Sequence, residues 1–99
     1  MSEAPPTDFD TVVFEATSRD ESIVVAVGRS GNSLGVELHA PAMALSDAEL
    51  ANRIIKLNTL AHLRSQLALR EEWEASHVTV SSALPTHDQV ATYEALIDF

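Results

Sequence analysis

The chain has 99 residues, 45% of them hydrophobic, and a formal net charge of −9 from 15 acidic and 6 basic side chains. This length fits one domain with a small core and excludes a second independently folded domain. The chain has no cysteine, which excludes a disulfide framework, a thiolate nucleophile and a cysteine-based metal site.

Residues 1–10 hold two prolines and three acidic side chains, with no basic start and no apolar core of a secretory signal. No apolar run in the chain reaches the roughly 20 residues of a membrane span. We therefore expect a flexible lead over residues 1–10, a single domain over residues 11–99, no membrane contact and a cytoplasmic location.

Three short segments predict an antiparallel β-meander. Residues 11–16 and 23–27 are rich in β-branched side chains, and residues 34–39 alternate apolar with other positions. Between the last two segments, Gly31 and Asn32 tolerate the positive φ that a tight hairpin needs. The polar residues 18–22 form the other turn.

A long helix follows the meander. Ser46 and Glu49 have the spacing of a capping box, and Leu45 and Leu50 stand at the positions of a hydrophobic staple. No Gly or Pro interrupts the chain from there to about Trp73, so the helix extends for roughly 40 Å at about 1.5 Å per residue.

This helix carries two apolar stripes at helical spacing. The first stripe is Leu50, Ile54, Leu57, Ala61 and Ala68. The second stripe is Leu60, Leu63 and Leu67. One stripe is expected to pack on the sheet, and the other then needs a second surface. We expect self-association to supply it; the alternative is that the segment from Thr86 folds back over the second stripe.

The C-terminal part predicts an extended segment over residues 77–82 and a second helix over 86–98, which Thr86 and Gln89 open with another capping box. Trp73 is either an interface anchor or a residue packed under this tail. The candidate interface residues of the whole chain are Leu60, Leu63, Leu67, Trp73, Tyr93, Ile97 and Phe99.

No pattern in the sequence carries catalytic chemistry. The four histidines lack the spacing of a metal-binding pair, and the three glycines form no phosphate-binding motif. We expect no enzyme activity, no metal and no cofactor.

The basic residues are concentrated on the long helix. Four of the six lie there: Arg53, Lys56, Arg64 and Arg70. From Glu71 onward the chain has six acidic residues and no Lys or Arg, and such a field repels nucleic acid and favours basic protein partners. Those four basic residues are the candidates for DNA binding, which is the alternative function.

The strand at 23–27, the turn at Gly31, the strand at 34–38 and the helix opening at 43–51 resemble the core of the YbaB/EbfC family of small nucleoid-associated proteins. The helix opening and the first strand around Phe14 are similar to YbaB-like proteins of actinobacterial type VII (ESX) secretion loci, of the EspD and EspH kind. The resemblance covers the middle half of the chain.

The resemblance implies an α+β, YbaB-like fold in which a three-stranded sheet packs on the long helix, and it implies a homodimer. It further implies either DNA binding or an accessory role in secretion. Tyr93 lacks the acidic residue four positions later that type VII export signals carry, because Ile97 stands there. We therefore expect a dimeric, cytoplasmic accessory or chaperone-like protein that binds secretion components or substrates, with DNA binding as the alternative.

Overall fold

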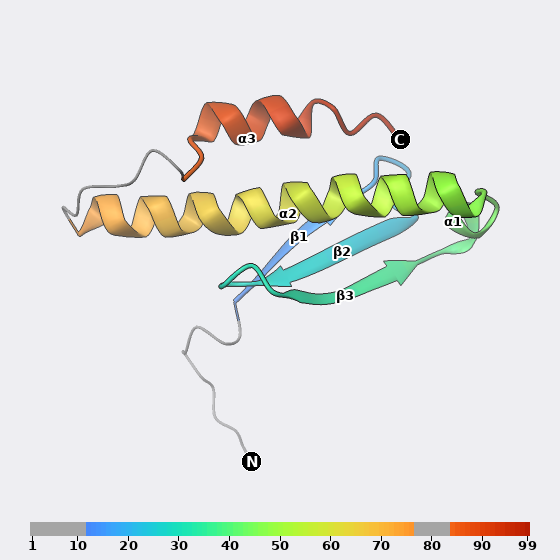
Figure 1. Cartoon of the computed structure of the whole chain (residues 1–99), viewed down its shortest axis with the longest axis horizontal. Coiled ribbons are helices and arrows are strands. Elements are labelled where there is room, and N and C mark those ends of the chain that lie inside the picture. Colours follow the sequence, from blue (N-terminus) through green and yellow to red (C-terminus); the bar gives the residue numbers. More distant parts are fainter. Residues whose placement is uncertain (1–11, 77–83) are drawn as a thin grey trace, which may run out of the picture.

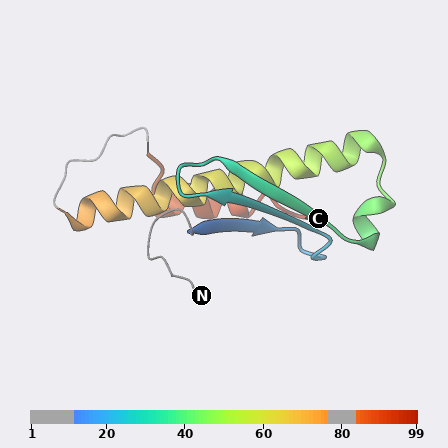
Figure 2. The same ribbon diagram turned by 90° about the horizontal axis from the view of Figure 1, so that it is seen from below.

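The computed structural model describes residues 12–76 and 84–99. Its elements, in chain order, are β1 (Val13–Thr17), β2 (Ile23–Gly28), β3 (Ser33–Leu38), α1 (Ala40–Met43), α2 (Asp47–Ala75) and α3 (His87–Glu94). The strands form one antiparallel sheet in the order β1-β2-β3. The long helix α2 lies across one face of the sheet, and α3 runs along another side of α2 (Figures 1 and 2). The predicted α+β architecture is confirmed.

The register of the strands defines a helix-facing side of the sheet. Val25 of β2 pairs with Ala16 of β1 and with Val36 of β3. Because side chains alternate between the two faces of a strand, every second residue from these positions points toward α2. On β2, Ile23, Val25 and Val27 are fully buried there.

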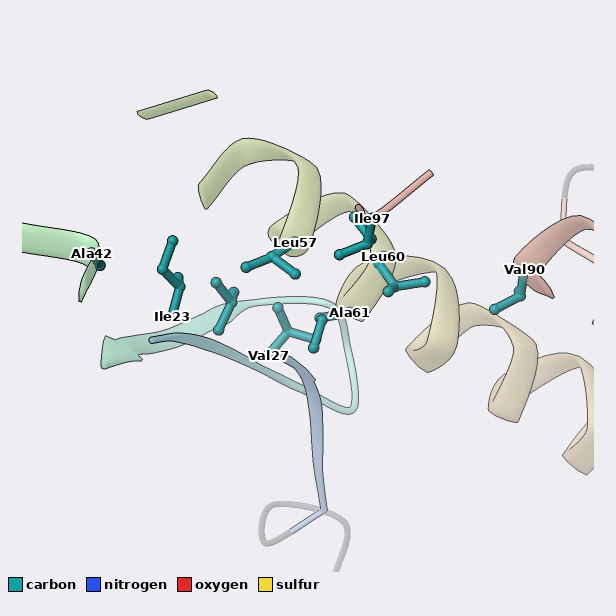
Figure 3. Packing of buried hydrophobic residues seen from close by; sticks show 10 residues of the cluster. Ile23, Val27, Ala42, Leu57, Leu60, Ala61, Val90 and Ile97 are labelled. Carbon is teal, nitrogen blue, oxygen red and sulfur yellow. The ribbon is translucent and has the colours of Figure 1, made fainter. Parts of the chain in front are cut away.

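The core lies between this side of the sheet and the first stripe of α2, and it continues past Leu60 to Val90 and Ile97 of the C-terminal part (Figure 3). Leu57 and Ala61 are fully buried, and Leu50 and Ile54 are partly buried against the same cluster. The first stripe therefore packs on the sheet as predicted. The helix packs mainly on β1 and β2, which leaves β3 at an open edge.

Gly31 fixes the hairpin between β2 and β3. Its φ is +85°, and a Cβ atom at this position would lie 2.5 Å from Cε1 of His62 on α2. Both the backbone conformation and the close approach of the helix therefore require glycine. The hairpin is confirmed, and its loop spans residues 29–32.

The two predicted capping boxes have different outcomes. At α3, the Thr86 side chain accepts from the Gln89 backbone N–H, and the Gln89 side chain accepts from the Thr86 N–H, so that box is complete. At α2, the Ser46 hydroxyl accepts from the Glu49 N–H at 3.1 Å, but the Glu49 carboxylate pairs with Arg53 at 2.8 Å. The Glu49 carboxylate therefore binds Arg53 instead of accepting a hydrogen bond from the backbone N–H of Ser46, which would complete the box.

The C-terminal helix is shorter than predicted. It ends at Glu94 rather than near residue 98, because Arg19 binds the carbonyl oxygens of Ile97 and Phe99 and holds the chain beyond Ala95 out of the helix. The short helix α1, with Ala42 buried, was not predicted. The predicted lead at 1–10, the first strand position Thr11 and the extended segment at 77–82 lie outside the described residues.

Asp20 holds together the turn between β1 and β2. Its Oδ1 accepts hydrogen bonds from the Ser18 hydroxyl at 2.7 Å, from the Ser22 hydroxyl at 2.7 Å and from the Ser22 N–H at 3.0 Å. These bonds favour the charged carboxylate, first those from the two hydroxyls, and they lower the pKa of Asp20 from 3.8 to about 2.

A lowered pKa means that Asp20 stabilises the fold above pH 4 and loses this effect as the pH falls from about 4 to about 2. We expect Asp20→Ala to lower the urea midpoint at pH 6, and the gap to the unmodified chain to narrow toward pH 2. Circular dichroism during urea titrations at several pH values measures this. Asp98→Ala removes the same charge elsewhere as the control, and a gap for Asp20→Ala that stays constant down to pH 2 would contradict the assignment.

Candidate interaction surface

Four apolar side chains beside the β3 edge are exposed although they lie close to the core. The exposed fractions are 51% for Leu34, 45% for Val36, 36% for Leu38 and 64% for Ile55. Val36 sits directly opposite Val25 on the helix-facing side of the sheet, yet Val25 is fully buried. The difference arises because α2 crosses β1 and β2 and does not extend over β3.

Ile55 belongs to this surface by its position on α2. His62 lies against Gly31, so this flank of the helix faces the β2–β3 hairpin. Ile55 precedes His62 by seven residues, or two helical turns, and therefore lies on the same flank. We call Leu34, Val36, Leu38 and Ile55 the β3 surface.

The free edge of β3 also presents backbone hydrogen-bonding groups. The His39 N–H donates to the Ser22 carbonyl at 2.8 Å, so His39 points its backbone groups toward β2. In an antiparallel ladder the direction alternates with every residue. Leu38 and Val36 therefore point their N–H and C=O away from β2, and Leu34 follows beyond an irregularity in the register.

Charges are sparse on this edge. Glu37 is the single ionised residue within β3, and it points to the side of the sheet away from α2. The neighbouring His39 lies 3.6 Å from the Glu37 carboxylate. No Lys, Arg or Pro interrupts the strand, although these are the residues by which proteins usually protect an edge.

The predicted interface residues lie mostly where α2 and the C-terminal segment meet, three on the helix and three in the segment itself. Leu60 and Ile97 are buried together in the core, and α3 packs on α2. The partly buried members of the set are Leu63, Leu67, Tyr93 and Phe99. Trp73 is exposed at the end of α2. Two arrangements were predicted for the second stripe, self-association or cover by the C-terminal segment. In the structure the C-terminal segment, residues 84–99, covers it.

The arginines predicted as DNA contacts hold this segment in place. Arg53 lies 4.9 Å from the ring centroid of Phe99, and Arg64 pairs with Glu94 at 3.1 Å. Arg70 donates to the carbonyl of Leu84 at 2.9 Å. Lys56 makes no ion pair within residues 12–76 and 84–99. Three of the four candidates are therefore committed to contacts inside the chain.

Arg19 completes the attachment and was missed by sequence reasoning. Its backbone N–H donates to the Phe99 carbonyl at 2.5 Å, and its Nε donates to the Ile97 carbonyl at 2.7 Å. A depression of about 340 Å³ next to it is lined by Thr17, Arg19, Leu60, Arg64, Glu94 and Ile97. Both arginines in its wall already bind acceptors within the chain. No local signal marked Arg19, because its role depends on a segment almost 80 positions away in the chain.

The described part of the chain has no group of three His, Asp or Glu side chains that could hold a metal ion. Among the helices in that part, none is both long enough and apolar enough to cross a membrane. Comparisons of the chain with models of known families, with curated proteins and with solved structures find no match.

Proposed function

We propose that the chain is a non-enzymatic, acidic protein-interaction module that acts as a dimeric accessory or chaperone-like protein and binds other proteins through the β3 surface. The observation that carries this proposal is the β3 surface itself, where exposed apolar side chains accompany unpaired backbone groups. A strand edge of this kind is a template for an added strand.

The exposed apolar area and the unpaired backbone groups favour a protein as the binding partner of this surface. The exposed parts of the four side chains sum to roughly 400 Å², which is the size of the largest apolar patch on an ordinary monomer and is often functional. An added strand would satisfy the bare N–H and C=O groups and place its own side chains beside the exposed ones of β3.

The charge distribution narrows the class of partner. With a net charge of −9, the chain attracts basic protein surfaces and repels phosphates and anionic lipid. DNA binding is the weaker alternative, because Arg53, Arg64 and Arg70 already have partners within the chain. The resemblance to YbaB-like proteins of type VII secretion loci suggests cytoplasmic secretion components or their substrates as partners.

A photoreactive amino acid placed at Leu34 tests this proposal in cells. We expect ultraviolet light to join this position to a protein, while the same amino acid at the exposed Thr92 of α3 gives no adduct with that protein. The joined protein, once purified, is expected to bind the unmodified chain and to bind a Val36→Lys variant at least tenfold more weakly.

The absence of any protein adduct at Leu34, or equal adducts at Leu34 and Thr92, would refute the use of the β3 surface. Adducts only with proteins unrelated to secretion would refute the secretion role and leave the interaction module standing.

A further inference from the structure

We propose that the depression between β1, α2 and the C-terminal segment is a binding site for a carboxylate that has an amide N–H and a small apolar group beside it. This is the chemistry of the last residue of a peptide and of an N-acyl amino acid. The site lies at the β1 edge of the sheet, and the β3 surface lies at the opposite edge. The two sites are therefore separate, and neither depends on the other.

Three parts of the fold meet at this depression. The end of β1 and the turn after it supply Thr17 and Arg19. The helix α2 supplies Leu60 and Arg64, which stand one helical turn apart on the same face. The C-terminal segment closes the third side. The space between these parts is about 340 Å³, within the range of about 300 to 1,000 Å³ for small-ligand sites.

Arg19 has unused hydrogen-bond donors at this depression. Its Nε donates to the Ile97 carbonyl at 2.7 Å, which fixes the plane of the guanidinium group. Its two terminal nitrogens form no hydrogen bond or ion pair within residues 12–76 and 84–99. One N–H from each of these nitrogens matches the two oxygens of a carboxylate. Arg19 therefore holds a preorganised position for one carboxylate.

The backbone of Thr17 offers a second contact. The Ser18 N–H donates to the Ile23 carbonyl at 3.0 Å, so Ser18 directs its backbone groups toward β2. The direction alternates along an antiparallel strand, and Thr17 therefore directs its N–H and C=O toward the free edge. The Glu15 carbonyl follows the same alternation, because it accepts from Nη1 of Arg64 at 2.6 Å instead of from β2. A ligand amide N–H next to the carboxylate thus finds an acceptor in the Thr17 carbonyl.

The local charge favours a ligand with a single negative charge. Arg64 and Glu94 pair at 3.1 Å and compensate each other. Within the described part of the chain no carboxylate pairs with Arg19, so its positive charge is left for a ligand. The whole chain carries a charge of −9, which repels a ligand with two or more negative charges more strongly than a monocarboxylate.

The apolar wall limits the affinity. Leu60 and Ile97 line the depression but are only 2% and 4% exposed, so they offer a small apolar contact. A single side chain of the ligand gains little from burial there. We expect a dissociation constant on the order of 1 mM for an isolated N-acyl amino acid.

NMR titration of the isotope-labelled full chain tests the site. N-acetylleucine, added up to about 20 mM, should shift the amide signals of Thr17, Arg19 and Ile97 in a saturable way. N-acetylleucinamide lacks the carboxylate, and N-acetyl-N-methylleucine lacks the amide N–H. Each of these two compounds should bind about fivefold more weakly or worse. Inorganic phosphate should cause no saturable shift at the same positions.

A pair of variants tests the role of the guanidinium group. Arg19→Gln should weaken the binding of N-acetylleucine about tenfold or more. Lys56→Gln is the matched control, because it removes one positive charge from α2 outside the lining of the depression. Arg19→Gln also loses the bond to the Ile97 carbonyl, so circular dichroism first establishes that this variant is folded. The comparison of the compounds on the unmodified chain does not depend on any variant.

A short peptide that ends in leucine separates the two sources of this chemistry. Tighter binding of the peptide than of N-acetylleucine assigns the site to the C-termini of proteins. Weaker binding of the peptide assigns it to small N-acyl amino acids. The same peptide with an amidated C-terminus should bind as weakly as N-acetylleucinamide in either case.

The absence of saturable shifts with N-acetylleucine, or equal binding of N-acetylleucinamide, would overturn the site. Equal affinity of the Arg19→Gln and Lys56→Gln variants would overturn it as well. Saturable shifts with inorganic phosphate at the same positions would show unspecific anion binding and have the same consequence. Adducts at Leu34 test the β3 surface and are independent of these results, so the two proposals fail separately.

Discussion

Replacing Leu57 with alanine is expected to lower the free energy of unfolding by about 3 to 4 kcal/mol. Leu57 is fully buried at the centre of the contact between α2 and the sheet, and truncation there removes apolar burial and leaves a cavity that the rigid strands cannot close. A chain of 99 residues with one domain has a total stability of about 5 to 15 kcal/mol. The loss is therefore a large fraction of the whole.

Urea denaturation followed by circular dichroism measures this effect. Leu96→Ala is the matched control, because Leu96 is exposed on the C-terminal segment and its truncation should change the stability by less than about 0.5 kcal/mol. A loss below about 1 kcal/mol for Leu57→Ala would show that α2 does not pack on the sheet through this residue.

Ending the chain at Ser82 is expected to have the second large effect. The truncation removes α3 and the arginine-bound carbonyls of Ile97 and Phe99, which exposes Leu60 and the rest of the second stripe. The exposed leucines should drive concentration-dependent association, and the melting temperature should fall. Carrying Val36→Lys in both the full-length and the truncated chain weakens association through β3, so that light scattering after size exclusion reports on the second stripe.

A full-length variant with Ile97→Asp provides the control for chain length. It places a carboxylate at a buried position and should release the C-terminal segment without shortening the chain. If the truncated chain stays monomeric and has the same melting temperature as the full-length chain, the C-terminal segment does not protect the second stripe. Association in both variants would identify this segment as a cover that a partner could displace.

Local chemistry predicted much of the fold. The β-branched runs predicted β1 and β2, the alternating pattern predicted β3, Gly31 predicted the hairpin, and Ser46 and Thr86 predicted both helix starts. These features depend on the residue itself and on neighbours within a few positions, so a sequence pattern is enough to find them. The packing of the first stripe on the sheet followed from helical periodicity.

The candidate site was much less predictable. The second stripe and the C-terminal aromatic residues were expected at a surface, and the chain covers most of them itself. The β3 residues were predicted as a strand, but their exposure depends on which strands α2 crosses. Helical periodicity identifies the face of a helix and not its angle to the sheet, so it cannot indicate which strand remains uncovered.

The sequence by itself therefore determined the elements, their order and the strongly acidic charge of the chain, because these depend on composition and on short-range backbone preferences. Only the tertiary structure decided that the arginines of α2 hold the C-terminal segment, that Arg19 joins them, and that β3 keeps an open apolar edge. Those outcomes depend on contacts between residues far apart in the chain, and their geometry is set by packing of the whole domain rather than by any local pattern.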